Sequence, residues 1–318
     1  APGQDPFLGS AMAAAQVRGY QGEGLDRPGT IMATAKHFAA YGAALGGRDY
    51  DGADISDRTL HEVYLPPFHA AAQAGAGSFM AAFNTVAGVP MHAHRPLLTG
   101  ILREEWGWQG PVVSEWMGVA ELIPHGVAGN GGEAAALALA AGVDIDMSSQ
   151  LYFGELRAAI DRDPALAAQL DAAVRRVLEA KERLGLFDDP YRGADPAREA
   201  GTMLTDAHRA AAREAALRSI VLLKNDGGLL PIARGVRRIA VIGALADDPN
   251  SQLGSWRALG RAEEVRPLLP ALREALPAGT DLVYEAGASP IDEDATGIAP
   301  AVEAARNADL VLLVVGED

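Results

Sequence analysis

The sequence predicts an α/β protein made of two successive blocks of parallel strands and covering helices. In each block, short apolar runs of strand length alternate with segments of helical periodicity. The connections between them are short, which is typical of βα units and parallel sheets. A chain of 318 residues is long enough to bury two cores, so we expect two domains.

The first block contains four expected strands, at residues 31–38, 78–84, 111–116 and 143–148. Helical periodicity marks residues 56–74, 95–106, 133–141 and 156–160. A further helix is expected over 170–184, where Leu170, Val174 and Val177 recur at helical spacing before Gly185. The opening residues 1–6 read as a loop.

The second block follows a connector that begins at Asp188-Asp189-Pro190 and runs to about Gly201. Its expected strands are 237–243, 281–287 and 309–316, and its expected helices are 268–276 and 298–305. This pattern indicates an open, doubly wound sheet. No glycine-rich turn follows Gly243, so a nucleotide site is disfavoured.

Charge and composition exclude several classes of partner. The net charge of −15 and the lack of any Lys/Arg run argue against nucleic acid and anionic membranes. The chain has no cysteine, which excludes disulfides and thiolate metal sites. No apolar stretch is long enough to cross a bilayer, and the first six residues lack signal-peptide character. A neutral sugar fits this composition.

Polar residues stand at the ends of all four expected strands of the first block: Lys36 and His37, Asn84, Glu115 and Trp116, and Asp146. The carboxyl ends of parallel strands in a β/α barrel share one face, where active sites lie. Each residue could alternatively cap its own strand, but the set favours a site.

Glu115 is the sharpest candidate, because it follows the apolar run 111–113 and precedes Trp116. A carboxylate can attack an anomeric carbon while an indole stacks on the sugar ring. The alternative is a glutamate in a surface turn. Lys36 and His37 suit hydrogen bonding to vicinal hydroxyls.

Two other polar groups are weaker candidates. Arg48, in a loop after Gly46-Gly47, either folds over the site or forms a surface ion pair. His92 and His94 lack a carboxylate at a metal-ligand spacing, so loop packing is favoured over metal binding and no metal site is expected.

Seven stretches, taken together, resemble glycoside hydrolase family 3, and they cover nearly the whole chain in the family's order. They are KHFAAYGAALGGRDYDGADIS at Lys36, LHEVYLPPF at Leu60, FMAAFNTVAGVPMHAH at Phe79, LLTGILREEWGWQGPVVSEW at Leu97, AGVDIDM at Ala141, RLGLFDDPY at Arg183 and RSIVLLKNDGGLLPI at Arg218. The resemblance implies a partial TIM (β/α)8-type barrel followed by a partial α/β sandwich. The implied boundaries are 1–187 for the barrel portion, 188–203 for a linker and 204–318 for the sandwich portion.

The resemblance also implies an activity, the hydrolysis of terminal non-reducing β-D-glucosyl or related β-glycosyl residues with retention. Glu115 occupies the nucleophile position. The implied sugar-binding side chains are Lys36, His37, Arg48, Phe83, Trp116 and Trp256. The implied substrates are β-linked oligosaccharides and aryl or alkyl β-glucosides. No cofactor is implied, since retention needs only two carboxyl groups and water.

The nucleophile motif departs from the family pattern, which is Ser-Asp-Trp where this chain has Ser114-Glu115-Trp116. One additional methylene shifts the carboxylate by about an ångström, so we expect catalysis to be impaired about a hundredfold or more. The glutamate is either an engineered substitution or a natural variant with a readjusted backbone.

The chain is also expected to be a fragment. The barrel portion shows four clear strands, and the family's acid/base glutamate is expected beyond residue 318. The stretch 46–56 contains no histidine, which favours the two-domain glucosidase or xylosidase branch over the N-acetylglucosaminidase branch.

Two alternatives to the glycosidase remain. One is a carbohydrate-binding protein on the same fold without hydrolysis, and the other is a barrel aldolase with Lys36 as Schiff-base lysine. A periplasmic or secreted location is favoured over a cytoplasmic one, and a homodimer is an option beside a monomer.

Overall fold

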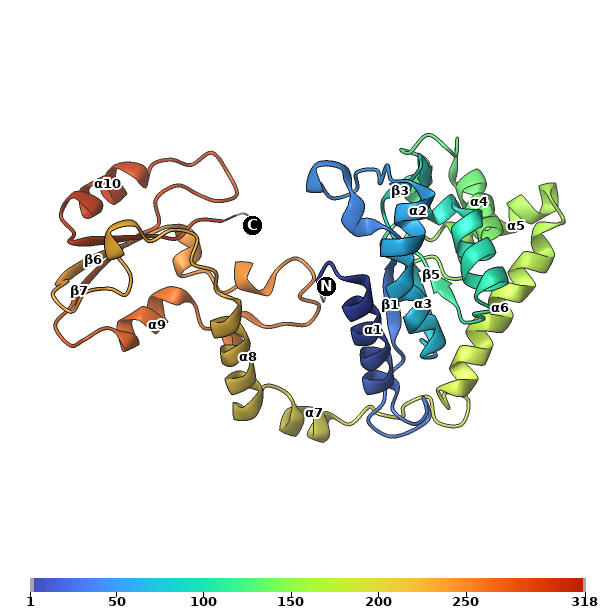
Figure 1. Cartoon of the computed structure of the whole chain (residues 1–318), viewed down its shortest axis with the longest axis horizontal. Coiled ribbons are helices and arrows are strands. Elements are labelled where there is room, and N and C mark those ends of the chain that lie inside the picture. Colours follow the sequence, from blue (N-terminus) through green and yellow to red (C-terminus); the bar gives the residue numbers. More distant parts are fainter. Residues whose placement is uncertain (1–2, 317–318) are drawn as a thin grey trace. The chain divides into compact units, whose positions relative to one another are not determined.

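The computed structural model of this chain describes residues 3–316. It divides into two compact units, Ala1–Met203 and Leu204–Asp318 (Figure 1). No helix in the described part of the chain combines the length and the hydropathy needed to span a bilayer.

The first unit is built on a parallel sheet in the order β1-β2-β5. Its strands are β1 (Thr34–Phe38), β2 (Ser78–Ala81) and β5 (Val112–Val113). Ile145 extends the sheet through a parallel bridge to Val113. The four expected strands of this block therefore adjoin in sequence order, which is the arrangement of a (β/α) barrel.

Helices follow each of these strands; α3 contacts β1, and buried residues of α4, α5 and α6 pack together in a separate cluster. The helices are α2 (Asp57–Thr59), a π-helical turn (Leu60–Tyr64), α3 (Leu65–Gln73), a second π-type helix (Pro96–Glu105), α4 (Gly131–Ala141), α5 (Leu151–Arg162) and α6 (Leu166–Arg183). All four residues of β2 are buried, as expected for a strand covered on both faces. The α/β class and the partial barrel are thus confirmed.

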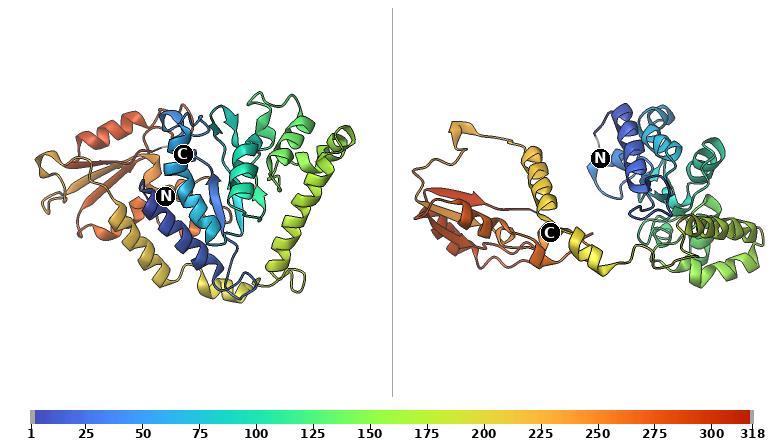
Figure 2. Two further views of the ribbon diagram at one scale, coloured as in Figure 1. Left: turned by 45° about the vertical axis from the view of Figure 1, so that its right-hand side comes forward. Right: turned by 90° about the horizontal axis from the view of Figure 1, so that it is seen from below.

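The loop expected over residues 1–6 ends one residue early, because α1 (Pro6–Gln21), which was not expected, begins at Pro6. The Asp5 carboxylate accepts a hydrogen bond from the backbone N–H of Leu8 at 2.7 Å and so caps the helix. Proline at the first helical position lacks only an N–H that would be unpaired there. Residues 1–2 lie outside the described residues. Helix α1 lies alongside α3, seen as dark blue beside light blue in Figure 2.

A buried carboxylate joins three separate segments of this unit. Asp144 accepts hydrogen bonds from Arg103 and Arg176, each at 2.7 Å, and from the backbone N–H of Val112 at 2.7 Å. Its side chain is 1% exposed. The charge is compensated by two guanidinium groups, which is the condition under which a buried carboxylate is tolerated.

The expected connector contains helix α7 (Pro196–Thr202), and α8 (Asp206–Ser219) follows at the start of the second unit. Neither helix was expected from the sequence. Thr205 caps α8 by accepting from the N–H of His208. The short side chains of the Ala-rich stretch 210–216 left α8 without a strong apolar stripe.

The second unit is a parallel sheet in the order β7-β6-β8. Its elements are β6 (Arg238–Ile242), α9 (Leu268–Ala275), β7 (Asp281–Glu285), α10 (Ile298–Arg306) and β8 (Leu310–Leu313). Ile239 and Val241 pack with Leu269 of α9, whereas Ile242 faces Val302 of α10. The two helices therefore cover opposite faces of the sheet, as in the expected doubly wound domain (Figure 1).

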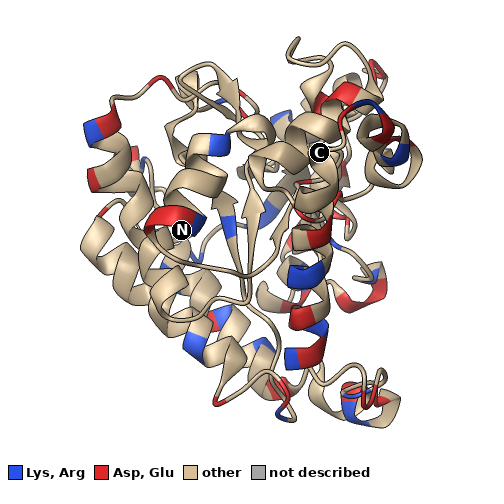
Figure 3. Ribbon diagram, turned by 90° about the vertical axis from the view of Figure 1, so that its right-hand side faces the viewer, with Lys and Arg blue, Asp and Glu red and all other residues tan. Residues whose placement is uncertain are grey.

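Short elements complete the fold. A hairpin of β3 (Thr85–Val86) and β4 (Val89–Pro90) follows β2 and was not expected. The 3-10 turns are Tyr41–Ala43, Leu45–Gly47, Met91–Ala93, Ala120–Leu122, Asp226–Gly228, Ala244–Ala246, Ser251–Leu253 and Ala262–Glu264. On the face shown in Figure 3, acidic and basic residues are interspersed along the helices rather than gathered in a basic stripe.

Candidate active site

The first unit brings Glu115 and His37 together from different strands. Glu115 comes two residues after β5, and His37 is the fourth residue of β1. The distance between His37 Nε2 and Glu115 Oε1 is 3.6 Å. The expectation that polar groups at the strand ends of this unit converge is therefore met for these two residues, although β2 lies between their strands.

Glu115 is 5% exposed, so it is not a glutamate in a surface turn. Its Oε2 accepts a hydrogen bond from the backbone N–H of Trp116 at 2.8 Å. One carboxylate oxygen is thus held by the main chain, and the other faces His37. A carboxylate fixed in this way is suited to act as a nucleophile, because little reorganisation is needed before attack.

The surroundings of His37 favour its neutral form. Burial lowers its pKa below 6.5, and the positive charge of Lys36 lowers it further. The negative charges of Glu115 and Asp49 oppose that shift without cancelling it. A neutral imidazole can both donate and accept hydrogen bonds, which suits contact with a sugar hydroxyl. Lys36 itself is exposed.

A group of aromatic residues adjoins His37 through Tyr41. Tyr41 contacts the His37 ring edge-on, with ring centroids 5.3 Å apart, and its hydroxyl donates to Asp49. Burial, and next the hydrogen bond to Asp49, raise the pKa of Tyr41. Phe83 is 5% exposed and packs against Tyr50 at a centroid distance of 4.3 Å.

Glu121 is a further acidic residue whose charge interacts with those of Glu115 and Asp49. Burial raises its pKa to about 6, and the charges of Glu115 and Asp49 add to the shift. Its Oε2 is buried without a hydrogen-bond partner in the structure. The sequence pattern did not single out Glu121, because it lies in a turn, six residues after Glu115, where a carboxylate is ordinarily solvated.

The other residues expected at the strand ends have structural roles. Asp146 accepts hydrogen bonds from the Ser149 hydroxyl and from the N–H of Tyr152, so it caps the first turn of α5. Asn84 is fully buried, and its amide donates to the carbonyl oxygens of Ala39 and Thr85. Asp146 thus caps a helix, and Asn84 joins the segments that follow β1 and β2, so neither residue simply caps its own strand.

The remaining expected site residues are exposed. Arg48 forms an ion pair with Asp51 at 2.9 Å, with its side chain 77% exposed. Trp116 is 51% exposed next to Glu115. Trp256 belongs to the second unit and is 72% exposed.

His92 and His94 both face backbone N–H groups. Nε2 of His92 accepts from the N–H of Glu115 at 3.0 Å, and Nδ1 of His94 accepts from Leu97 at 3.3 Å. Within residues 3–316, no group of three His, Asp or Glu side chains is arranged to hold a metal ion.

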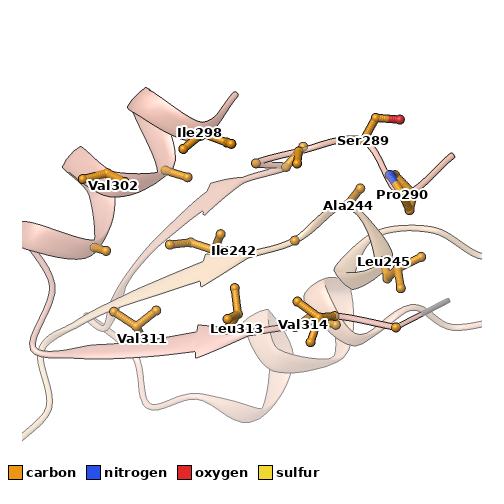
Figure 4. Close-up of a pocket in the computed structure, with 18 residues that line it drawn as sticks. Ile242, Ala244, Leu245, Ser289, Pro290, Ile298, Val302, Val311, Leu313 and Val314 are labelled. Carbon is orange, nitrogen blue, oxygen red and sulfur yellow. The ribbon is translucent and has the colours of Figure 1, made fainter. Parts of the chain in front are cut away.

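The second unit contains a cavity of about 530 Å³ at the carboxyl ends of its strands, between α10 and the sheet (Figure 4). Among the described residues that line it, the side chains are hydrocarbon apart from that of Ser289. Gly243 is required beside it, because a Cβ there would lie 1.9 Å from the carbonyl oxygen of Val314. The side chains of the described lining residues include no charged group, and the candidate site remains the one around Glu115.

Comparison with known proteins identifies the family. Residues 2–180 match the model of the glycosyl hydrolase family 3 N-terminal domain, and residues 220–318 match that of the C-terminal domain. The chain belongs to glycosyl hydrolase family 3.

Relatives of known name agree with this assignment. The chain is 38% identical to a periplasmic beta-glucosidase of Salmonella typhimurium over 99% of its own length and 44% of the relative. It is also 38% identical to a beta-xylosidase of Formosa agariphila, over 99% and 45%. A crystal structure of a Listeria innocua beta-glucosidase in complex with isofagomine superposes with a TM-score of 0.79, at 39% identity over 98% of this chain and 43% of that one. The chain thus spans less than half the length of these relatives.

Proposed function

We propose that this chain carries the nucleophile of a retaining β-glycosidase that removes terminal β-D-glucosyl or related residues from oligosaccharides and aryl or alkyl glucosides. The observation that supports this most is the buried Glu115 carboxylate, 3.6 Å from the neutral His37 and held by the Trp116 N–H. Membership of family 3 and the names of the relatives support the substrate class.

In the proposed reaction, Oε1 of Glu115 attacks the anomeric carbon of the terminal sugar. The bond from that carbon to the aglycone oxygen breaks, and the aglycone leaves with a proton from an acid group. Water then attacks the same carbon, the ester bond to Glu115 breaks, and the water proton returns to the acid group, which has acted as base. The acid/base group is expected in the part of the relatives that this chain does not span.

We propose sugar-binding roles for six side chains. Lys36 and His37 bind hydroxyls of the terminal sugar, and Trp116 stacks on its ring. Phe83, which packs on Tyr50, contributes an aromatic surface to the sugar site. Arg48 folds over the mouth of the site, and Trp256 stacks on the next sugar.

Covalent trapping tests the nucleophile. The probe is 2,4-dinitrophenyl 2-deoxy-2-fluoro-β-D-glucoside, whose phenolate leaves without a proton, so the test does not depend on the acid/base group. We expect mass spectrometry to find the fluoroglucosyl ester on the peptide containing Glu115, and no ester in Glu115→Gln. A label on another residue, or equal labelling of Glu115→Gln, contradicts the proposal.

Glu115 stands where the family pattern has an aspartate, and this difference gives a second test. It also favours a carbohydrate-binding protein without hydrolysis as the alternative function. We expect Glu115→Asp to trap the probe about a hundredfold faster, because the shorter side chain restores the family geometry. Calorimetric binding of glucose without labelling of either form supports a carbohydrate-binding protein instead.

We also infer a periplasmic or secreted location, supported by the name of the Salmonella relative. Fractionation of the source cells tests it, and recovery in the cytoplasm contradicts it. Sedimentation velocity decides between a monomer and a homodimer.

A further inference from the structure

His92 occupies a position that the proposed reaction does not explain. Its side chain is 2% exposed, and its Nε2 accepts the backbone N–H of Glu115 at 3.0 Å. The two residues are 23 positions apart in the sequence. The imidazole is carried by the 3-10 turn Met91–Ala93 that follows the β3–β4 hairpin.

The sheet shows why an acceptor is needed there. Alternate residues of a strand direct their backbone groups to opposite neighbours. Ser114 donates to Ile145 on one side, and Pro111 accepts from Phe79 of β2 on the other. Glu115 is four residues after Pro111, so its backbone N–H points to the same side, toward β2. Strand β2, however, ends at Ala81. His92 supplies the acceptor that a neighbouring strand would otherwise provide.

Only a neutral imidazole with a free lone pair on Nε2 can accept this hydrogen bond. Burial lowers the pKa of His92 to about 3, which keeps the ring neutral at any pH at which the protein would function. The proton of the neutral ring is therefore on Nδ1.

The segment after Glu115 closes around the same ring. A Cβ on Gly118 would lie 2.2 Å from Nε2 of His92, so the absence of a side chain lets the turn pack on the imidazole. The carbonyl of Glu115 accepts from the Gly118 N–H at 3.0 Å and from the Ser114 hydroxyl at 2.8 Å. Both backbone groups of Glu115 are thus bonded.

We infer that His92 is a positioning residue, which as a neutral acceptor fixes the main chain of Glu115 and thereby aims its carboxylate at the anomeric carbon. The inference rests on the proposed role of Glu115 as nucleophile. It differs from ordinary core packing because it requires an acceptor atom at the Nε2 position, and not merely a side chain of similar volume.

A matched pair of variants distinguishes a positioning role of His92 from ordinary core packing. Glutamine places its amide oxygen near the position of Nε2, whereas methionine has a similar length and only a weak acceptor. With the fluoroglucoside probe, we expect His92→Met to lower the labelling rate at saturating probe about a hundredfold with little change in the half-saturating concentration. We expect His92→Gln to stay within a few-fold of the wild type. Equal losses in the two variants overturn the inference.

Two further measurements do not depend on catalysis, and the first of them needs no variant. In the unaltered protein, ¹⁵N spectra should show His92 as the neutral Nδ1–H tautomer at pH 7, and a protonated ring or the Nε2–H tautomer overturns the inference. Amide hydrogen exchange at Glu115 should be protected in the unaltered protein and in His92→Gln but fast in His92→Met. If these signatures appear while the probe labels nothing, the role of Glu115 as nucleophile fails and the hydrogen bond stands.

Discussion

Nε2 of His37 lies 3.6 Å from Oε1 of Glu115, and the two side chains reach that contact from different strands of the sheet. Burial and Lys36 lower the pKa of His37, while Glu115 and Asp49 raise it. The ionisation state of this histidine therefore reports directly on the carboxylate beside it.

We expect the His37 imidazole to titrate below 6.5, and its pKa to respond oppositely to two substitutions. Glu115→Gln removes a negative charge and should lower the pKa further, because the imidazolium loses a favourable neighbour. Lys36→Met removes a positive charge and should raise it. NMR titration of the ring measures both shifts, with His37→Gln assigning the resonance. A rise in Glu115→Gln would contradict the contact.

Gly118→Ala should destabilise the protein, because its Cβ would lie 2.2 Å from the fully buried His92 ring. Overpacking of this kind costs about 1–3 kcal/mol of unfolding free energy. Gly154→Ala in α5 is the control, since no atom lies within 4 Å of its added Cβ. Urea unfolding should show the control unchanged or slightly stabilised. Adding His92→Ala should relieve part of the Gly118→Ala cost, and strict additivity would argue against the clash.

Asp144→Asn should be more damaging, because it leaves the guanidinium groups of Arg103 and Arg176 without their buried counter-charge. Removing one partner of a buried ion pair costs about 3–5 kcal/mol. Asp161→Asn breaks an exposed pair with Arg157 and serves as the control, for which little change is expected. Similar urea midpoints for the two variants would show that the Asp144 cluster contributes little.

The burial of neutral His92 predicts a pH dependence of stability. The unfolded histidine binds a proton near pH 6.5, whereas the folded one resists protonation down to about 3. The contribution of His92 to the free energy of unfolding is therefore complete above pH 6.5. It declines as the pH falls below that value, by at most about 1.4 kcal/mol per pH unit.

His92→Gln lacks this titration and retains the other histidines. As the pH falls from 6.5 to 5, we expect the unfolding free energy of the wild type to decrease relative to that of His92→Gln. A constant difference over that range would show that His92 does not remain buried and neutral.

The local pattern predicted most of the elements that build the site. The strands around His37 and Glu115 stood out because a strand covered on both faces must be a short apolar run. Their polar ends were expected to converge, because the carboxyl ends of parallel strands share one edge of the sheet. Helices α1 and α8 were missed, since small alanine side chains give a weak apolar stripe and both helices depend on caps, at Asp5 and Thr205.

The sequence by itself determined the family, the α/β class and the position of the candidate nucleophile, because each is written in contiguous motifs or in local periodicity. Only the tertiary structure decided that His92 accepts the N–H of Glu115, that Gly118 packs on that ring, and that Asp144 rather than Asp146 joins the buried arginines. These contacts join segments brought together by the hairpin and by the order of the strands. A hydrogen bond between residues far apart in the chain leaves no periodic trace in either segment, and so the fold had to be known before these roles could be assigned.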